Sequence, residues 1–264
     1  GMKNITPFPW YGSKFTQVSW VTSLLPETER YVEPFGGSGV VMLNREPSDV
    51  ETFNDLNSGV VNFFDVIREQ REEFLEALSY TPHSREMFER ASNTEVEDDS
   101  VKEALYFLIS VAQAFGGVEG RSWARSIGTS RRGMAQRSAS WDYRKGVIEK
   151  VADRMMRVQI ENTDALKLIE DHDHPECTFY CDPPYPPESR NDTDSYKHEF
   201  DAEQHRELFE VVDACEGNVA VSGYNSSLNQ ELYSDWQMHS EGEKTLAGSG
   251  TGSREEVMWT NYTV

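Results

Sequence analysis

The chain has 264 residues, a formal net charge of -21 and 37% hydrophobic residues. Its length allows one domain with an insertion or two small domains, and the lack of an apolar run of 18 residues argues against a membrane protein. Three cysteines are too few for a disulfide framework, so we expect a protein of a reducing cytoplasm.

Basic residues are concentrated in one part of this acidic chain. From Arg121 to Lys145, seven basic residues accompany one acid, a local charge of +6, whereas the remainder has 18 basic and 45 acidic residues. An acidic protein repels nucleic acid overall, but a concentrated basic segment can hold a phosphate backbone. The segment is either a DNA-contact surface or a solvated arginine-rich loop, and its tryptophan either stacks on a base or packs in the core. The candidate contact residues are Arg121, Trp123, Arg125, Arg131, Arg132 and Arg137.

Strands and helices alternate in the first part of the chain. Apolar residues at helical spacing predict helices over 13–25, 40–45 and about 60–67, and short apolar runs predict strands over 30–32 and 50–53.

The alternation stops between about residues 81 and 157. Ser100 and Glu103 resemble a capping box in front of an amphipathic helix. A stretch rich in Gly, Ser and Arg follows over 116–140, and apolar spacing predicts another helix over 147–155. We interpret 81–157 as a mostly helical insertion.

The alternation then resumes to the end of the chain. Such a pattern predicts an α/β fold with a parallel sheet covered on both faces, formed here by residues 1–80 and 158–264. The predicted elements are strands over 158–161, 177–181, 219–222 and 257–264, a helix over 165–169, and a helix capped by Asp201.

Glu33-Pro34-Phe35-Gly36-Gly37-Ser38-Gly39 follows the first predicted strand and opens a helix. Glycines allow a tight turn and close approach to a ligand, and the free N–H groups of a helix start favour a carboxylate or phosphate. A plain strand-to-helix turn is the alternative. Asn54-Asp55 ends the next strand, where a carboxylate can accept hydrogen bonds from ribose hydroxyls. This spacing also fits a dinucleotide enzyme, and an ordinary helix cap is the alternative, since Asn57-Ser58 follows.

Asp182-Pro183-Pro184-Tyr185 follows the apolar strand over 177–181. Successive prolines stiffen the turn, and because proline donates no N–H, nearby carbonyls stay available as acceptors. The aspartate adds a carboxylate acceptor and the tyrosine a flat ring. Together they suit the amino group and the face of a nucleobase, with a plain Pro-Pro turn as the alternative.

A zinc site is a weaker interpretation. His172, His174, Cys177 and Cys181 are close in sequence, but both cysteines lie on one predicted strand and the histidines in an acidic turn. We expect no metal.

In this order, from Trp10 to the C-terminus, these motifs resemble those of the Dam-type (class D12) DNA adenine-N(6) methyltransferases. The resemblance implies a Rossmann-like S-adenosylmethionine-dependent methyltransferase fold, with a seven-stranded sheet, a reversed last hairpin and an inserted target-recognition domain. It implies that Asp182, Pro183, Pro184 and Tyr185 are catalytic. The cofactor-binding residues it implies are Trp10, Tyr11, Lys14, Glu33, Phe35, Gly37, Gly39, Asp55, Asp164 and Asp182.

The function expected from this resemblance is site-specific methylation of the exocyclic amino group of an adenine flipped out of double-stranded DNA. The enzyme would be an orphan, phage-borne or restriction-linked monomer in the cytoplasm of a bacterial, archaeal or phage-infected cell, with a cognate restriction endonuclease as a further candidate partner. The alternatives are amino methylation of cytosine or RNA, and a DNA-binding protein that keeps the fold without catalysis.

Overall fold

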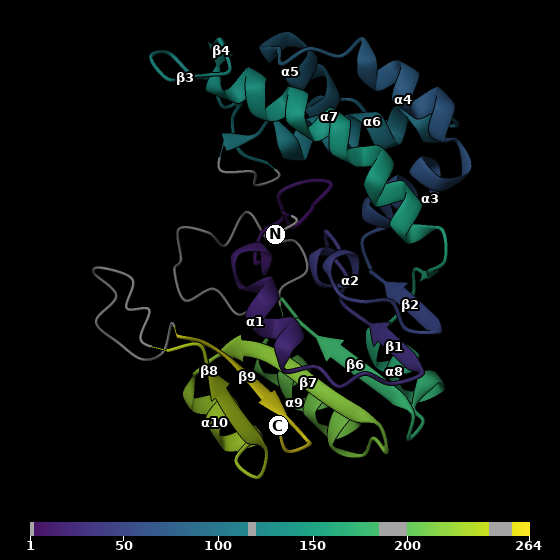
Figure 1. Cartoon of the computed structure of the whole chain (residues 1–264), viewed down its shortest axis with the longest axis vertical. Helices are drawn as coiled ribbons and strands as arrows, with labels where there is room; N and C mark the ends of the chain where they lie inside the picture. The colour runs from purple at the N-terminus through teal and green to yellow at the C-terminus, as the bar shows by residue number, and fades with distance from the viewer. Residues whose placement is uncertain (1–2, 116–119, 185–199, 243–254) are drawn as a thin grey trace. The chain divides into compact units, whose positions relative to one another are not determined.

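The computed structural model describes residues 3–115, 120–184, 200–242 and 255–264 (Figure 1). The chain packs into two compact units. The first unit comprises Gly1–Phe15, Gly37–Asn44 and Asn57–Asn162, and the second comprises Thr16–Gly36, Arg45–Leu56 and Thr163–Val264. The expected division at residues 81 and 157 distinguishes a catalytic part from a DNA-recognition insertion. The two packing units do not test that division of function, so it stays a prediction.

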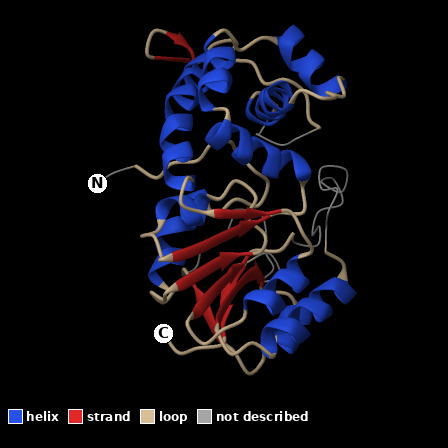
Figure 2. Cartoon of the chain, turned by 90° about the vertical axis from the view of Figure 1, so that its right-hand side faces the viewer, coloured by secondary structure: helices blue, strands red, loops and turns tan. Residues whose placement is uncertain are grey.

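A seven-stranded, mostly parallel sheet organises the fold, with its strands side by side in Figure 2. Neighbouring pairs among β2, β1, β6 and β7 are parallel, whereas β9 runs antiparallel to both β7 and β8. The α/β class and the reversed last hairpin are therefore confirmed. In spatial order the strands are β5 (Gln159–Glu161), β2 (Val50–Asn54), β1 (Arg30–Glu33), β6 (Cys177–Cys181), β7 (Asn218–Tyr224), β9 (Glu256–Thr260) and β8 (Gln237–Ser240).

The register of the central strands brings the predicted motifs to one edge of the sheet. Glu33 of β1 is opposite Phe53 of β2, and Val32 of β1 is opposite Phe179 of β6. Because parallel strands end at the same edge, the segments that follow these three strands start from neighbouring positions.

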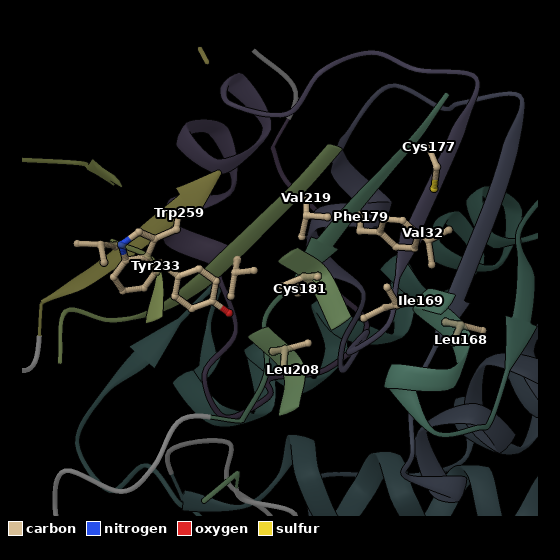
Figure 3. Packing of buried hydrophobic residues seen from close by; sticks show 13 residues of the cluster. Val32, Leu168, Ile169, Cys177, Phe179, Cys181, Leu208, Val219, Tyr233 and Trp259 are labelled. Carbon is tan, nitrogen blue, oxygen red and sulfur yellow. The ribbon is translucent and has the colours of Figure 1, made fainter. Parts of the chain in front are cut away.

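The core of the second unit lies on one face of the sheet (Figure 3). Side chains alternate along a strand, so Phe179 and Cys181 of β6 share this face while Tyr180 points to the other. Helices α8 (Ala165–His172) and α9 (Ala202–Asp213) cover the face with Ile169 and Leu208, both buried. The expected cap at Asp201 is confirmed, as part of a capping box with Gln204. Two shorter helices in this unit are α1 (Val18–Ser23) and α10 (Ser227–Leu232).

The first unit is mostly helical. Phe8, Phe63 and Phe107 pack edge to face or tilted, with ring centroids 5.2 to 6.0 Å apart, and form an aromatic core. The unit contains α2 (Val40–Asn44), α3 (Ser58–Glu69), α4 (Arg71–Ser79), α5 (Arg85–Asn93), α6 (Ser100–Ala112), α7 (Gln136–Met155) and the hairpin of β3 (Ser130–Arg131) and β4 (Met134–Ala135).

Several predicted boundaries are wrong. Asp99, not Ser100, caps α6, because its carboxylate accepts from the Lys102 N–H at 3.0 Å. Helix α7 begins at Gln136, inside the Gly-, Ser- and Arg-rich stretch and well before residue 147, where the helix was predicted to begin. The 13–25 helix shortens to a 3₁₀ turn over Phe15–Gln17 followed by α1, and the last strand ends at Thr260. Among the residues that the structure describes, no helix has the length and apolarity needed to cross a membrane.

Candidate active site

The loop after β1 starts from a buried carboxylate. The Tyr31 hydroxyl donates to Glu33 Oε2 at 2.6 Å, and the Arg45 guanidinium lies over the Tyr31 ring, 3.7 Å from its centroid. Burial, reinforced by Glu33, holds the pKa of Tyr31 well above its usual value. The tyrosine therefore stays a hydrogen-bond donor, and it fixes the first acidic residue of the predicted cofactor loop.

The glycines of this loop are required for different reasons. Gly37 and Gly39 have φ angles of +55° and +71°, which side-chain-bearing residues rarely adopt. Gly36 has an ordinary φ, but a Cβ there would lie 2.1 Å from Cε2 of Phe53. Sequence reasoning named Gly37 and Gly39 as site residues and left out Gly36, whose requirement comes from a ring on the next strand.

Asn54 is the last residue of β2, and Asp55 follows it. Asn57, rather than Asp55, caps α3, since its Oδ1 accepts from Gly59 and Val60 N–H groups at 2.9 and 3.3 Å. The helix-cap alternative for Asp55 is therefore ruled out. Asp164, the weaker cofactor candidate, does cap a helix: its Oδ2 accepts from the Lys167 N–H of α8 at 3.1 Å.

The Asp-Pro-Pro turn leaves the end of β6, beside β1. Asp182 is half-buried and Pro183 is buried. Two residues before Asp182, the Tyr180 hydroxyl lies 2.7 Å from the Ser222 hydroxyl, and burial raises the pKa of Tyr180, with Asp182 as the second cause. Tyr185, the predicted stacking residue, lies outside the described residues.

Phe35, a predicted cofactor contact, is part of an aromatic pair. Its ring meets Phe200 edge to face, with centroids 5.3 Å apart, and Phe200 lies just before α9. Phe200 in turn packs against His205 at 5.4 Å. The loop after β1 is thus supported by the segment that leads into α9.

In the first unit, the Trp10–Lys14 segment forms a tight turn closed by a bond from the Ser13 N–H to the Trp10 carbonyl at 3.0 Å. Lys14 is 3% exposed and its Nζ donates to the Gly12 carbonyl at 2.8 Å. Trp10 lies against Gly37, where a Cβ would come within 2.7 Å of the indole Cδ1. Two segments predicted from separate motifs therefore pack together, while Tyr11 beside them is half-buried.

Trp123, the aromatic residue of the basic segment, contacts two side chains of the segment around α5. It stacks on His83, with centroids 4.6 Å apart, and the Arg85 guanidinium lies 5.1 Å from its ring. Its Nε1 donates to Oε1 of Gln113 at 3.2 Å. Trp123 is half-buried, so it is neither a fully enclosed core residue nor a loose side chain.

Gln113 is a residue that sequence reasoning missed. It is 1% exposed, its Oε1 also accepts from the Ser84 N–H at 3.2 Å, and its Nε2 donates to the Pro82 carbonyl at 3.1 Å. Its own carbonyl accepts from the Ala124 N–H at 3.0 Å. One buried amide thus fixes the start of the basic segment to α6 and to the segment before α5.

The structure brings together only some of the predicted arginines. Arg125 and Arg137 line a pocket of about 300 Å³, whereas Arg131 and Arg132 lie exposed in the β3–β4 hairpin. Arg132 donates to the Ala139 carbonyl at 2.7 Å, and Arg121 is half-buried nearer the start of the segment. The other residues lining the pocket are neutral and polar: Ser126, Thr129, Gln136 and Ser140.

The histidines and cysteines considered for zinc do not form a metal-binding group. Within the described ranges, no three His, Cys, Asp or Glu side chains are placed so that they could hold an ion. Cys177 and Cys181 are fully buried in β6, and burial raises the pKa of the Cys177 thiol to about 12.

The first strand of the mostly parallel sheet opens into a glycine loop, and the adjacent strand ends in an Asp-Pro-Pro turn. This arrangement is the one expected for a methyltransferase. Comparison with protein families supports this class, because the model described as D12 class N6 adenine-specific DNA methyltransferase matches residues 10–246. The chain belongs to this family and is an adenine-specific DNA methyltransferase, as the sequence motifs predicted.

Individual relatives agree with the family assignment. The type II methyltransferase M1.LlaDCHI of Lactococcus lactis subsp. cremoris is 28% identical over 98% of this chain and 96% of its own length. The DNA adenine methylase of Escherichia coli (strain K12) is 23% identical over 97% of this chain and 93% of its own length. The DNA N-6-adenine-methyltransferase of Escherichia phage P1 is 26% identical over 86% of this chain but only 31% of its own length.

Proposed function

We propose that this enzyme transfers a methyl group from S-adenosylmethionine to the exocyclic amino nitrogen of an adenine rotated out of double-stranded DNA. The observation that carries the proposal is the adjacency of β1 and β6 in parallel register, with Val32 opposite Phe179. The strand that opens into the glycine loop therefore lies directly beside the strand that ends in Asp182-Pro183-Pro184.

The acidic side chains at this edge suit the proposed cofactor. S-adenosylmethionine carries a sulfonium, an ammonium and two ribose hydroxyls, all of which carboxylates can stabilise. Three acids lie at the ends of adjacent strands: Glu33 is the last residue of β1, Asp55 follows β2 and Asp182 follows β6. We assign Asp55 to the ribose, and Phe35 and Asp164 to the rest of the cofactor. Trp10, Tyr11, Lys14, Gly37 and Gly39 of the first unit are further candidates.

When bound, S-adenosylmethionine would supply the methyl group on a sulfonium, whose sulfur is a good leaving group because it departs as a neutral thioether. Adenine's amino nitrogen is a poor nucleophile because its lone pair is delocalised into the ring. Hydrogen bonds from its two N–H groups to the Asp182 carboxylate and the Pro183 carbonyl favour a pyramidal nitrogen with a localised lone pair. The nitrogen–carbon bond would form as the sulfur–carbon bond breaks, with the electron pair of the broken bond staying on the sulfur. A proton must afterwards leave the nitrogen, and Asp182 already accepts one of its N–H groups. Positioning and charge complementarity supply the catalysis.

Reaching that nitrogen requires extraction of the base from the duplex, which costs a few kcal/mol. Stacking on Tyr185 would return about 1–3 kcal/mol. We assign the DNA backbone to the basic segment. The pocket with Arg125 and Arg137 is suited to a phosphate, because every residue lining it is basic or a neutral hydrogen-bond donor. Arg121, Arg131, Arg132 and Trp123 are further candidate contacts, and a restriction endonuclease is a candidate partner by analogy with a type II relative.

The test is transfer of tritiated methyl groups to unmethylated DNA, followed by identification of the modified nucleoside. We expect N6-methyladenine with the wild type, none with Asp182→Ala, and binding of S-adenosylmethionine by both. Detection of methylated cytosine or methylated RNA would identify cytosine or RNA, instead of adenine in DNA, as the substrate. Binding of DNA without transfer would identify a non-catalytic protein. Transfer by Asp182→Ala at the wild-type rate would disprove the role of that residue.

A further inference from the structure

Asn54 lies where three segments of the second unit meet: its own strand end, the loop after β1 and the segment before α8. We propose that Asn54 is a positioning residue that holds the cofactor loop in its binding geometry and so sets the affinity for S-adenosylmethionine. This inference rests on the proposed function, because it takes the residues beside those segments to be cofactor contacts.

The side-chain amide of Asn54 makes three hydrogen bonds and is 0% exposed. Its Nδ2 donates to the Pro34 carbonyl at 2.9 Å and to the Thr163 carbonyl at 3.0 Å. Its Oδ1 accepts from the Thr163 N–H at 2.9 Å. The backbone carbonyl of Asn54 accepts a fourth bond, from the Gly36 N–H at 2.7 Å.

The partners determine the orientation of this amide and the residue type. Pro34 has no N–H and offers only its carbonyl as an acceptor, so Nδ2 rather than Oδ1 must point toward it. Thr163 offers both a carbonyl and an N–H to one side chain, which requires a donor and an acceptor on the same planar group. Aspartate is nearly isosteric but would place a buried carboxylate against two carbonyl oxygens, and alanine would remove the partner of three backbone groups, those of Pro34 and of the partly buried Thr163.

Each bonded segment carries a proposed cofactor residue next to the contact. Pro34 lies between Glu33 and Phe35, Thr163 precedes Asp164, and Asn54 itself precedes Asp55. One buried amide therefore couples the positions of three separate contact regions. Groups that are fixed before binding lose less conformational entropy on binding, which raises affinity without a new contact to the ligand.

The side chain of Asn54 takes no part in the hydrogen bonds between strands, because its partners lie outside the strands. Pro34 follows the last residue of β1, and Thr163 lies between β5 and α8. We therefore expect its loss to weaken cofactor binding more than it slows methyl transfer at saturating cofactor.

The experiment compares Asn54→Asp and Asn54→Ser with the wild type by calorimetric titration of S-adenosylmethionine and of S-adenosylhomocysteine. We expect Kd and the KM for the cofactor to rise about 10- to 100-fold, as follows from the loss of one or two buried hydrogen bonds. We expect kcat at saturating cofactor to change less than about threefold, and the Kd for DNA measured without cofactor to stay the same. The serine variant keeps a small polar group, so it serves if the aspartate variant does not fold.

Asn261→Asp is the control. Asn261 makes a similar pair of side-chain bonds on a more exposed residue, donating from Nδ2 to the Gly217 carbonyl at 3.0 Å and accepting at Oδ1 from the Val219 N–H at 2.7 Å. It follows the end of β9, beside the start of β7, at the opposite edge of the sheet from the strand ends that carry the site. This variant should lower the melting temperature and leave the cofactor Kd unchanged.

The outcomes separate the two proposals. A wild-type protein that does not bind S-adenosylmethionine would overturn the proposed function. Binding by the wild type together with equal binding by folded Asn54 variants, or a lower kcat with unchanged Kd, would overturn the positioning role alone. A cofactor Kd raised equally by Asn261→Asp would show that the effect is one of general stability.

Discussion

Gly36→Ala should destabilise the protein even though Gly36 has an ordinary backbone conformation. An added Cβ would lie 2.1, 2.3 and 2.6 Å from Cε2, Cζ and Cδ2 of Phe53. Non-bonded carbons are most stable at about 3.5–4.0 Å, so the ring or the loop must move by roughly 1.5 Å. Phe53 is fully buried in a central strand and has little space to move.

The magnitude follows from two opposing terms. Inserting a methyl group into a packed site costs about 1–3 kcal/mol. Restricting the unfolded chain by replacing glycine returns about 0.4–1 kcal/mol. The net loss of unfolding free energy should be about 1–2 kcal/mol. Because the Gly36 N–H bonds to Asn54, we also expect weaker binding of S-adenosylmethionine.

Urea unfolding of a double-mutant cycle tests this reasoning. Phe53→Ala removes the obstructing ring and is itself costly, by about 3–5 kcal/mol. In that background the steric cost of Gly36→Ala should vanish, which gives a coupling equal to that cost, about 1–3 kcal/mol.

Gly146→Ala is the control for the glycine substitution. Gly146 lies in α7, and a Cβ there meets nothing within 4 Å. This change should stabilise the helix by about 0.5–1 kcal/mol. If Gly36→Ala stabilises the protein like the control, or costs the same with and without the Phe53 ring, the steric argument is wrong.

Three further predictions concern buried polar groups. Arg45→Met should lower the unfolding free energy by about 3–5 kcal/mol, because it removes the cation that lies 3.2 Å from the fully buried Glu51 carboxylate; Arg45→Met/Glu51→Met should recover most of this loss in urea titrations, and an equal loss in both variants would contradict the ion-pair explanation. Burial lowers the pKa of His205 from 6.5 to about 4, so the unfolded chain binds the extra proton and stability should be retained above about pH 6.5 and fall as pH decreases toward 4; His205→Leu should show a shallower fall over this window, and identical pH profiles would refute the assignment. Gln113→Leu removes the amide that holds Trp123 and should weaken DNA binding about tenfold without changing cofactor binding; unchanged DNA affinity in a fluorescence-anisotropy titration would show that the basic segment does not depend on this anchor.

The elements that sequence could predict are those with a strong local signal. Strands β1, β2 and β6 are short apolar runs, and each is followed by a polar or glycine-rich turn, so their ends were located to within a residue or two. The positions of Asp55 and Asp182 follow directly from those strand ends. The order of motifs then identified the family, which supplied the sheet topology.

The elements that were missed have weak or competing local signals. Strand β8 is exposed at three of its four residues, so it shows no alternating pattern. Helix α7 begins in a Gly, Ser and Arg-rich stretch, where packing of Trp141, which donates to the Thr81 carbonyl at 2.7 Å, outweighs composition. Asp99 and Ser100 are both good caps, and sequence alone did not distinguish them.

The missed site residues depend on distant partners. Asn54 bonds to Thr163, 109 residues later in the chain, and Gln113 bonds to Pro82, 31 residues earlier. In sequence each is an ordinary polar residue at the end of an element. Only the fold shows that their amides are buried and that the oxygen and the nitrogen of each are hydrogen-bonded.

The reversed hairpin of the sheet has a consequence for biosynthesis. Strand β9 follows β8 in the chain but lies between β7 and β8. Until Glu256 has been synthesised, β8 lacks β9, the strand with which it pairs. The edge of β7 that β9 will cover is also still open. Completion of the sheet must therefore wait until residues Glu256–Thr260 have left the ribosome tunnel, so a ribosome stalled upstream of them would present an open strand edge to chaperones or to other chains.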